Sequence, residues 1–376
     1  MQRRHLYAAM TFGLSLVVVA SWADSPPPFT IPFSFTAHTA AKASEVNANF
    51  TALENQIQYL NQQLIAQQTI NNDQQSRINA LQTALSAIQG SNVMALDPYV
   101  ALVEVEDGHD RFITYPTVQF SGVNVQILNG TGDTFSTMNG LGNLIIGYNE
   151  YRSDGVLEFC SDGHYTNQTD CNSHGGIWGT NQRTGSHNLV LGISNSYTSF
   201  GGFLAGQYNV VNGPSASVAG GLRNMARTKF ASVSGGTYNT ASGEDSSVSG
   251  GNNNTASGDH ASVTGGEFNT AGGLSSSVAG GSSNVAYAQD SSISGGGHNY
   301  TSGPGSVVSG GYLNEARASD ATVSGGEHNQ AEGKYSTISG GAYNSAANQS
   351  STVGGGLGHS ATTQDGWRAG DLPESQ

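Results

Sequence analysis

The two cysteines of this chain, Cys160 and Cys171, are its most reactive side chains, and they lie close together in the sequence. In an exported protein such a pair forms a disulfide that closes a short loop. A metal site with His164 and His174 is the alternative, but two Cys and two His at these irregular spacings match no usual zinc pattern. The sequence therefore favours a disulfide, and we expect no metal and no cofactor.

Catalytic chemistry has little support elsewhere in the chain. Glu244 and Asp259 are carboxylates 15 residues apart on one edge of a repeat, but Leu274 takes the next place in that series. The glycine-rich runs lack the Lys and the strand-to-helix setting of a phosphate-binding loop. We therefore expect a protein that is not an enzyme, with an uncharacterised enzyme on a β-helix as an alternative.

A row of rings could bind a ligand without reacting with it. These residues precede an Asn at one place of the repeat and would line up on one edge: Tyr208, Tyr238, Phe268, His298, His328 and Tyr343. Exposed rings on a polar face suit contacts with carbohydrate or with a matrix protein. The alternative is that the rings stack for stability or pack against another chain.

The element that must position this edge is a 15-residue unit, S-V-S-G-G-x-x-N-x-A-x-G-x-x-S, present in ten consecutive copies. A strict period of this length predicts a solenoid, in which each coil covers the next. In the copy at Val233, the pair Gly235 and Gly236 fits a tight corner, and Asn239 fits a turn or a side-chain ladder. Val233 and Ala241 are the inward candidates.

The core of such a solenoid is thin. Burial of one Val and one Ala per coil is worth roughly 2 to 3 kcal/mol, whereas ordering the backbone costs about 1 to 2 kcal/mol per residue. We expect backbone hydrogen bonds to supply much of the difference. A core this thin also predicts that more than one chain contributes to it.

Residues 44–90 have the spacing of a coiled coil, with apolar residues alternately four and three apart. Three polar residues, Gln67, Asn71 and Gln74, interrupt the seam and favour self-association if they pair across an axis. The alternative is a helix packed on a globular neighbour. The apolar positions are Val46, Phe50, Leu53, Ile57, Leu60, Leu64, Ile78, Leu81, Leu85 and Ile88.

The other segments complete the predicted order of the chain. Residues 1–23 have the form of a secretory signal cleaved after Ala23, with a membrane anchor as the alternative. We expect an extended linker over 24–43, a β-rich connector over 91–139 with apolar alternation as far as Ile127, and solenoid repeats over 140–360. A cysteine loop over 155–182 interrupts the repeats, and a cap over 361–376 places Trp367 as a plug on the last coil.

Composition agrees with an elongated, exported protein. The 376 residues include 52 Gly and only 11% charged residues. The net charge of −14 and the lack of basic clusters in the repeats argue against a nucleic-acid partner.

The repeat resembles the head repeat of trimeric autotransporter adhesins, whose common pattern S-V-A-I-G-x-x-S-x-A-x-G is one residue shorter per unit. The match covers about 160 residues and aligns Val233, Gly236, Asn239 and Ala241 with the family's inward Val, corner Gly, polar turn residue and inward Ala. It implies a homotrimer in which each chain winds a left-handed parallel β-roll. We expect no counterpart of the family's C-terminal membrane anchor in this sequence, and the predicted coiled coil precedes the roll.

These features together predict a mainly β protein, a trimeric left-handed parallel β-roll or β-solenoid that follows an α-helical coiled coil. We expect a secreted, adhesin-like attachment protein or extracellular structural element, placed outside the cell or at the periphery of a bacterial outer membrane. The alternative is a monomeric β-solenoid that binds an ordered surface such as ice. Against it, Thr residues are scattered and form no repeated Thr-x-Thr rank.

Overall fold

The computed structural model describes residues 29–90, 94–106, 112–135, 137–152 and 158–369. The expected signal segment and its cleavage site at Ala23 lie outside this range. The chain divides into two compact units, Met1–Asn124 and Val125–Gln376, and each is described by itself. Within the described residues, no helix combines the length and the hydropathy needed to cross a bilayer.

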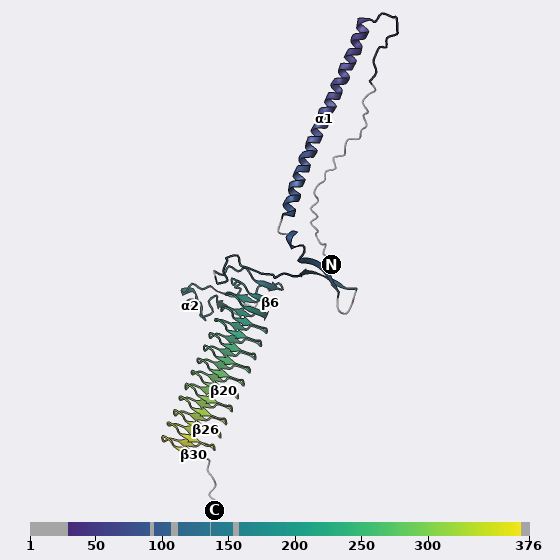
Figure 1. Ribbon diagram of the computed structural model, residues 1–376. Helices are drawn as coiled ribbons and strands as arrows, with labels where there is room; N and C mark the ends of the chain where they lie inside the picture. The colour runs from purple at the N-terminus through teal and green to yellow at the C-terminus, as the bar shows by residue number, and fades with distance from the viewer. Residues whose placement is uncertain (1–28, 91–93, 107–111, 136, 153–157, 370–376) are drawn as a thin grey trace, which may run out of the picture. The chain divides into compact units, whose positions relative to one another are not determined.

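The first unit contains the predicted helix, which is confirmed as α1 (Ala43–Gln89; Figure 1). It ends where the N–H of Gly90 bonds to the carbonyl of Ser86 at 2.9 Å. No residue of α1 is buried, and the apolar seam from Phe50 to Ile88 is exposed. Within the seam, Gln67 Nε2 donates to Asn71 Oδ1 at 2.9 Å along the same helix. Among the described residues, the seam is thus a long apolar stripe that stays exposed from Phe50 to Ile88.

An extended segment at 29–35 runs beside the start of α1. The amide of Asn49 holds it by both backbone groups of Phe33, since Oδ1 accepts the N–H at 2.9 Å and Nδ2 donates to the carbonyl at 2.7 Å. The alternating apolar residues of the segment and the first seam positions of α1 line a groove of about 520 Å³. Its apolar lining residues are Phe29, Ile31, Phe33, Phe35, Val46, Phe50 and Leu53.

After a short 3₁₀ helix, η1 (Met94–Leu96), the first unit ends in an antiparallel hairpin. Strand β1 (Val100–Glu106) pairs with β2 (Thr114–Phe120), with Val103 opposite Thr117. The apolar alternation continues to Ile127 in the sequence, but the strand does not, because residues 121–129 make no ladder. Alternation alone therefore overestimated the strand.

The second unit confirms the predicted parallel solenoid of 15-residue coils (Figure 1). Each regular coil gives one two-residue strand to each of two sheets, so that Val233 pairs with Val248 and Ala241 with Ala256. The first sheet has 14 strands: β3 (Leu144–Ile146), β6 (Leu189–Ile193), β8 (Phe203–Gln207), β10 (Ser217–Val218), β12 (Ser232–Val233), β14 (Ser247–Val248), β16 (Ser262–Val263), β18 (Ser277–Val278), β20 (Ser292–Ile293), β22 (Val307–Val308), β24 (Thr322–Val323), β26 (Thr337–Ile338), β28 (Thr352–Val353) and β30 (Trp367–Arg368). The second has 12: β7 (Ser196–Tyr197), β9 (Val210–Val211), β11 (Met225–Ala226), β13 (Thr240–Ala241), β15 (Thr255–Ala256), β17 (Thr270–Ala271), β19 (Val285–Ala286), β21 (Tyr300–Thr301), β23 (Glu315–Ala316), β25 (Gln330–Ala331), β27 (Ser345–Ala346) and β29 (Ser360–Ala361).

The ends of the solenoid differ from its regular middle. At the start, β3 pairs directly with β6, which places Leu144 opposite Leu189 and leaves the cysteine loop as an excursion between two stacked strands. At the end, Trp367 of β30 pairs with Thr352 of β28 and is 69% exposed. It lies at an outward position of the first sheet, and so it does not plug the last coil.

The core is richer than one Val and one Ala per coil. Val233 is 1% exposed and Ala241 0%, and Asn239 and Ser246 of the same coil are also 0% exposed. Four positions of each coil therefore face inward, two of them polar in this copy. Because these positions are buried within a single chain, the solenoid needs no neighbouring chain to close its core.

Candidate functional site

A ladder of buried Asn side chains holds the first turn of each coil, which joins the first sheet to the second. Asn239 Oδ1 accepts the backbone N–H of Asn254 in the next coil at 3.0 Å. Its Nδ2 donates to the carbonyls of Gly235 at 3.0 Å and Gly251 at 2.9 Å. The same pattern runs from Asn209 to Asn344. The amide is satisfied at both ends, which explains how a polar side chain lies in the core.

The two glycines before the ladder have different roles. Gly236 has a φ of 85°, and a Cβ there would overlap the carbonyl oxygen of Gly251. A Cβ at Gly235 would meet nothing within 4 Å. Only the second glycine is therefore required by the close stacking of the coils.

The six ring residues predicted to share an edge do occupy equivalent places on the first turn. Each directly precedes a ladder Asn and has a left-handed backbone, with φ of 58° at Tyr238, 55° at Phe268 and 53° at His298. For a residue other than glycine this conformation costs about 1 to 2 kcal/mol. Phe268 is 52% and Tyr343 58% exposed. We call this set, with Tyr208 and His328, the aromatic edge.

The second turn of each coil provides an internal comparison, because it has the same left-handed residue. Small or acidic residues fill that place in most coils, as at Asp245, Ser275 and Asp320, where φ is 56 to 57°. Three rings also stand there: Phe230, His260 and Tyr335. On the first turn the same backbone carries mostly rings and other large side chains. The remaining residues of this rank are Arg223, Asn253, Ser283, Leu313 and Gly358. The backbone conformation therefore does not account for the rings.

Contacts along the aromatic edge pass through residues of the intervening coils. The Arg223 guanidinium lies over the ring of Tyr208 at 5.5 Å and over that of Tyr238 at 5.3 Å. Arg223 also donates to the Tyr238 hydroxyl. Arg223 stands in the same repeat position as the rings, so a search by position and not by ring type would have found it.

At the other end of the edge, four rings contact one another in order. His298 and Tyr312 are 5.5 Å apart, Tyr312 and His328 6.4 Å, and His328 and Tyr343 4.7 Å with nearly parallel planes. His328 Nε2 is 3.7 Å from the carboxylate of Glu327. Tyr312 was missed by sequence reasoning because it stands one place earlier in its repeat than the other rings.

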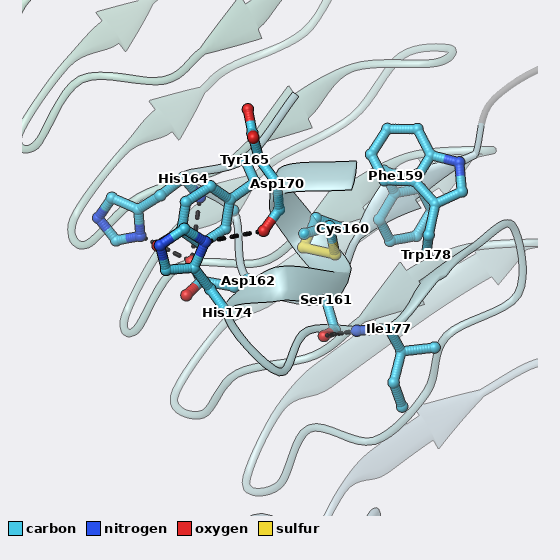
Figure 2. The surroundings of a disulfide bond; sticks show 12 residues. Phe159, Cys160, Ser161, Asp162, His164, Tyr165, Asp170, His174, Ile177 and Trp178 are labelled. Carbon is cyan, nitrogen blue, oxygen red and sulfur yellow. Dashed lines mark hydrogen bonds and ion pairs between the residues drawn. A yellow bond between two sulfur atoms is a disulfide. The ribbon is translucent and has the colours of Figure 1, made fainter. Parts of the chain in front are cut away.

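The structure joins the two cysteines in a disulfide within the excursion (Figure 2). Both are completely buried. Cys160 ends β4 (Phe159–Cys160), which pairs with β5 (Trp178–Gly179), and Cys171 lies in α2 (Gln168–Ser173). On the outside, His164 Nδ1 is 2.7 Å from Asp162 Oδ1. Burial raises the pKa of Asp162, but hydrogen bonds from the ring and the backbone N–H of His164 hold it below its ordinary value. Across the described residues, no three His, Cys, Asp or Glu side chains gather as metal ligands.

The cysteine loop lies against the outer side of the second sheet at its first three strands. Thr198 donates to the carbonyl of Ser161 at 2.7 Å, and Asn212 to that of Cys160 at 3.0 Å. Arg227 donates to two further carbonyls of the loop, at 3.0 and 2.6 Å. These three donors follow β7, β9 and β11 at the same place in successive coils. The loop is thus built onto the repeat, and the excursion touches the aromatic edge only at its first ring, where Arg152 lies over Tyr208 at 5.5 Å among the described residues.

The carboxylates considered for catalysis are engaged in links between coils. Glu244 pairs with Lys229 at 3.0 Å, and its backbone N–H donates to Asp259 Oδ1 at 2.9 Å. They serve as contacts between neighbouring turns.

No protein-family model matches this chain, and no curated protein matches it either.

Proposed function

We propose that this protein is an exported, non-enzymatic attachment protein or extracellular structural element, whose solenoid presents the aromatic edge to a surface outside the cell. The observation that carries the proposal is the contrast between the two turns of each coil. Both have the same left-handed backbone, yet the first turn carries six rings at this place and the second turn three, Phe230, His260 and Tyr335. On the first turn, Phe268 and Tyr343 are more than half exposed. Large rings that adopt the costly left-handed backbone and lie in a rigid row are expected where a ligand contacts them.

The proposal includes a homotrimer. The seam of α1 supports it, because its apolar residues from Phe50 to Ile88 are exposed in the part of the chain that the structure describes. The number of chains, three, and the left-handed winding are proposed from the resemblance of the repeat to the heads of trimeric autotransporters. The groove at 29–35 supports it further, because its apolar lining extends the first three seam positions.

The test is a binding array of glycans and matrix proteins, probed with the wild-type protein and with the variant Tyr238→Ala, Phe268→Ala, Tyr343→Ala. We expect the wild type to bind at least one class of surface and the variant to lose that binding while its circular dichroism is unchanged. Equal binding by the two proteins would overturn the assignment of the edge.

A second candidate function rests on the outer side of the first sheet. The two positions that flank each inward Val are small and uncharged in every regular coil. One rank is Ser217, Ser232, Ser247, Ser262, Ser277, Ser292, Val307, Thr322, Thr337 and Thr352, and the other is Ala219, Ser234, Ser249, Thr264, Ala279, Ser294, Ser309, Ser324, Ser339 and Gly354. Such ranks would suit an ordered surface such as ice. Thermal hysteresis of the purified protein tests this candidate, and its absence would exclude it.

A further inference from the structure

Five of the six rings of the aromatic edge follow a period twice that of the solenoid, whereas Tyr343 follows His328 by a single coil and stacks on it. Rings occur at every second coil, 30 residues apart: Tyr208, Tyr238, Phe268, His298 and His328. The coils between them carry Arg223, Asn253, Ser283 and Leu313 at the same place. Because neighbouring coils are stacked as β-strands about 4.8 Å apart, rings of this series repeat at roughly 10 Å along the solenoid.

This spacing excludes direct stacking as the reason for the series. Ring pairs that stabilise each other have centroids about 4.5 to 7 Å apart, and members of the series are separated by more than that. Arg223 bridges the first two rings and Tyr312 connects His298 to His328. Phe268, in the middle of the series, is half exposed. The period therefore fits something outside the solenoid.

We propose that the aromatic edge binds an extended, neutral polysaccharide lying along the solenoid, with one ring stacked on every second sugar. The inference rests on the attachment function proposed above and names its ligand class. A pyranose ring has an apolar face that stacks on an aromatic ring. In an extended β-linked chain, every second sugar presents the same face, and the disaccharide length is close to the spacing of the rings.

Polar groups beside the rings fit the hydroxyls of such a chain. Glu267 precedes Phe268 and accepts a hydrogen bond from Asn252 Nδ2 at 3.0 Å. Glu327 precedes His328 in the same way, and its side chain is 54% exposed. Carboxylates of this kind accept hydrogen bonds from sugar hydroxyls and disfavour an anionic chain, as does the net charge of −14. A periodic ligand also matches a periodic site better than the irregular surface of a folded protein does.

The experiment is calorimetric titration of the full chain with two series of oligosaccharides, β-1,4-linked glucose and β-1,4-linked N-acetylglucosamine, each from two to eight sugars. We expect the affinity for one series to rise with each added disaccharide. We also expect Tyr238→Ser or Phe268→Ser to lower the affinity for the longest member about three- to tenfold. Serine is a neutral replacement here, because Ser283 occupies the same turn position in the native chain.

The matched controls are Phe230→Ser and Tyr335→Ser, which remove exposed rings from the same left-handed position on the second turn. They should leave the affinity unchanged. Equal losses in the controls, or an affinity that stops rising after two or three sugars, would overturn the inference. If the wild type binds neither series but loses a matrix-protein contact in the Tyr238, Phe268, Tyr343 variant, the polysaccharide is wrong and the attachment function stands.

Discussion

Replacement of one Asn in the middle of the ladder tests how the scaffold is held together. In Asn269→Ala, the backbone N–H of Asn284 loses its acceptor, Asn269 Oδ1 at 3.0 Å. The carbonyls of Gly265 and Gly281 each lose a donor at 2.9 Å. The carbonyl of Gly281 keeps the N–H of Glu267, so the main cost comes from the orphaned N–H of Asn284 and from the carbonyl of Gly265. An unsatisfied buried donor costs about 1 to 3 kcal/mol, and we expect a total loss of roughly 2 to 4 kcal/mol.

The matched control is Ser276→Ala, which lies two places after Asn269 in the inward set of the same coil, beyond Ala271. Ser276 is also completely buried, but its hydroxyl has no hydrogen-bond partner, and Ala261 occupies this rank in the preceding coil. We expect the control to be neutral or slightly stabilising. Urea unfolding followed by circular dichroism gives both free energies, and hydrogen exchange at the amide of Asn284 locates the effect. Equal destabilisation by the two variants would refute the role given to the ladder.

Other predictions concern the corner, the disulfide and the cysteine loop. Gly266→Ala should lower the stability by several kcal/mol or prevent folding, because φ is 85° and the new Cβ would overlap the carbonyl oxygen of Gly281. Gly265→Ala should fold normally. Similar melting temperatures for the two variants would contradict this prediction. Non-reducing peptide mapping should link Cys160 to Cys171, and free thiols would refute the link. Replacement of both cysteines by Ser should lower the free energy of unfolding by about 2 to 4 kcal/mol, and hydrogen exchange should rise first in the loop. Because the pKa of Asp162 is lowered from 3.8, its carboxylate stabilises the loop above about that pH, and this contribution is lost as the pH falls through the lowered value. Exchange in the loop should therefore increase in acid in the wild type but not in Asp162→Asn, and the same acid response in both proteins would contradict the cause.

The sequence was sufficient to predict the solenoid, its 15-residue period and the helix before it, because strict repetition and heptad spacing leave few other folds. It underestimated the core. Asn239 and Ser246 are polar, and a count of apolar residues cannot show that the Asn amide is satisfied by the next coil or that a serine fits where other coils carry Ala. The expectation that a thin core requires partner chains therefore loses its basis, and the trimer now rests on the helix and the resemblance.

The candidate site was predictable in position but not in conformation. Spacing placed Tyr238 and Phe268 on one edge, yet their left-handed backbone was unexpected, because large side chains rarely adopt it. Arg223 and Tyr312 were missed because one is not aromatic and the other is displaced by one residue. That these two residues connect the rings follows only from the three-dimensional structure.

The exposed seam of α1 makes self-association the central physical claim of the proposed attachment protein. Multi-angle light scattering of the purified protein measures it directly, without assumptions about shape. Three chains joined through the seam predict a particle of about three times the chain mass. A particle with the mass of one chain, at the concentrations used for binding, would contradict the account.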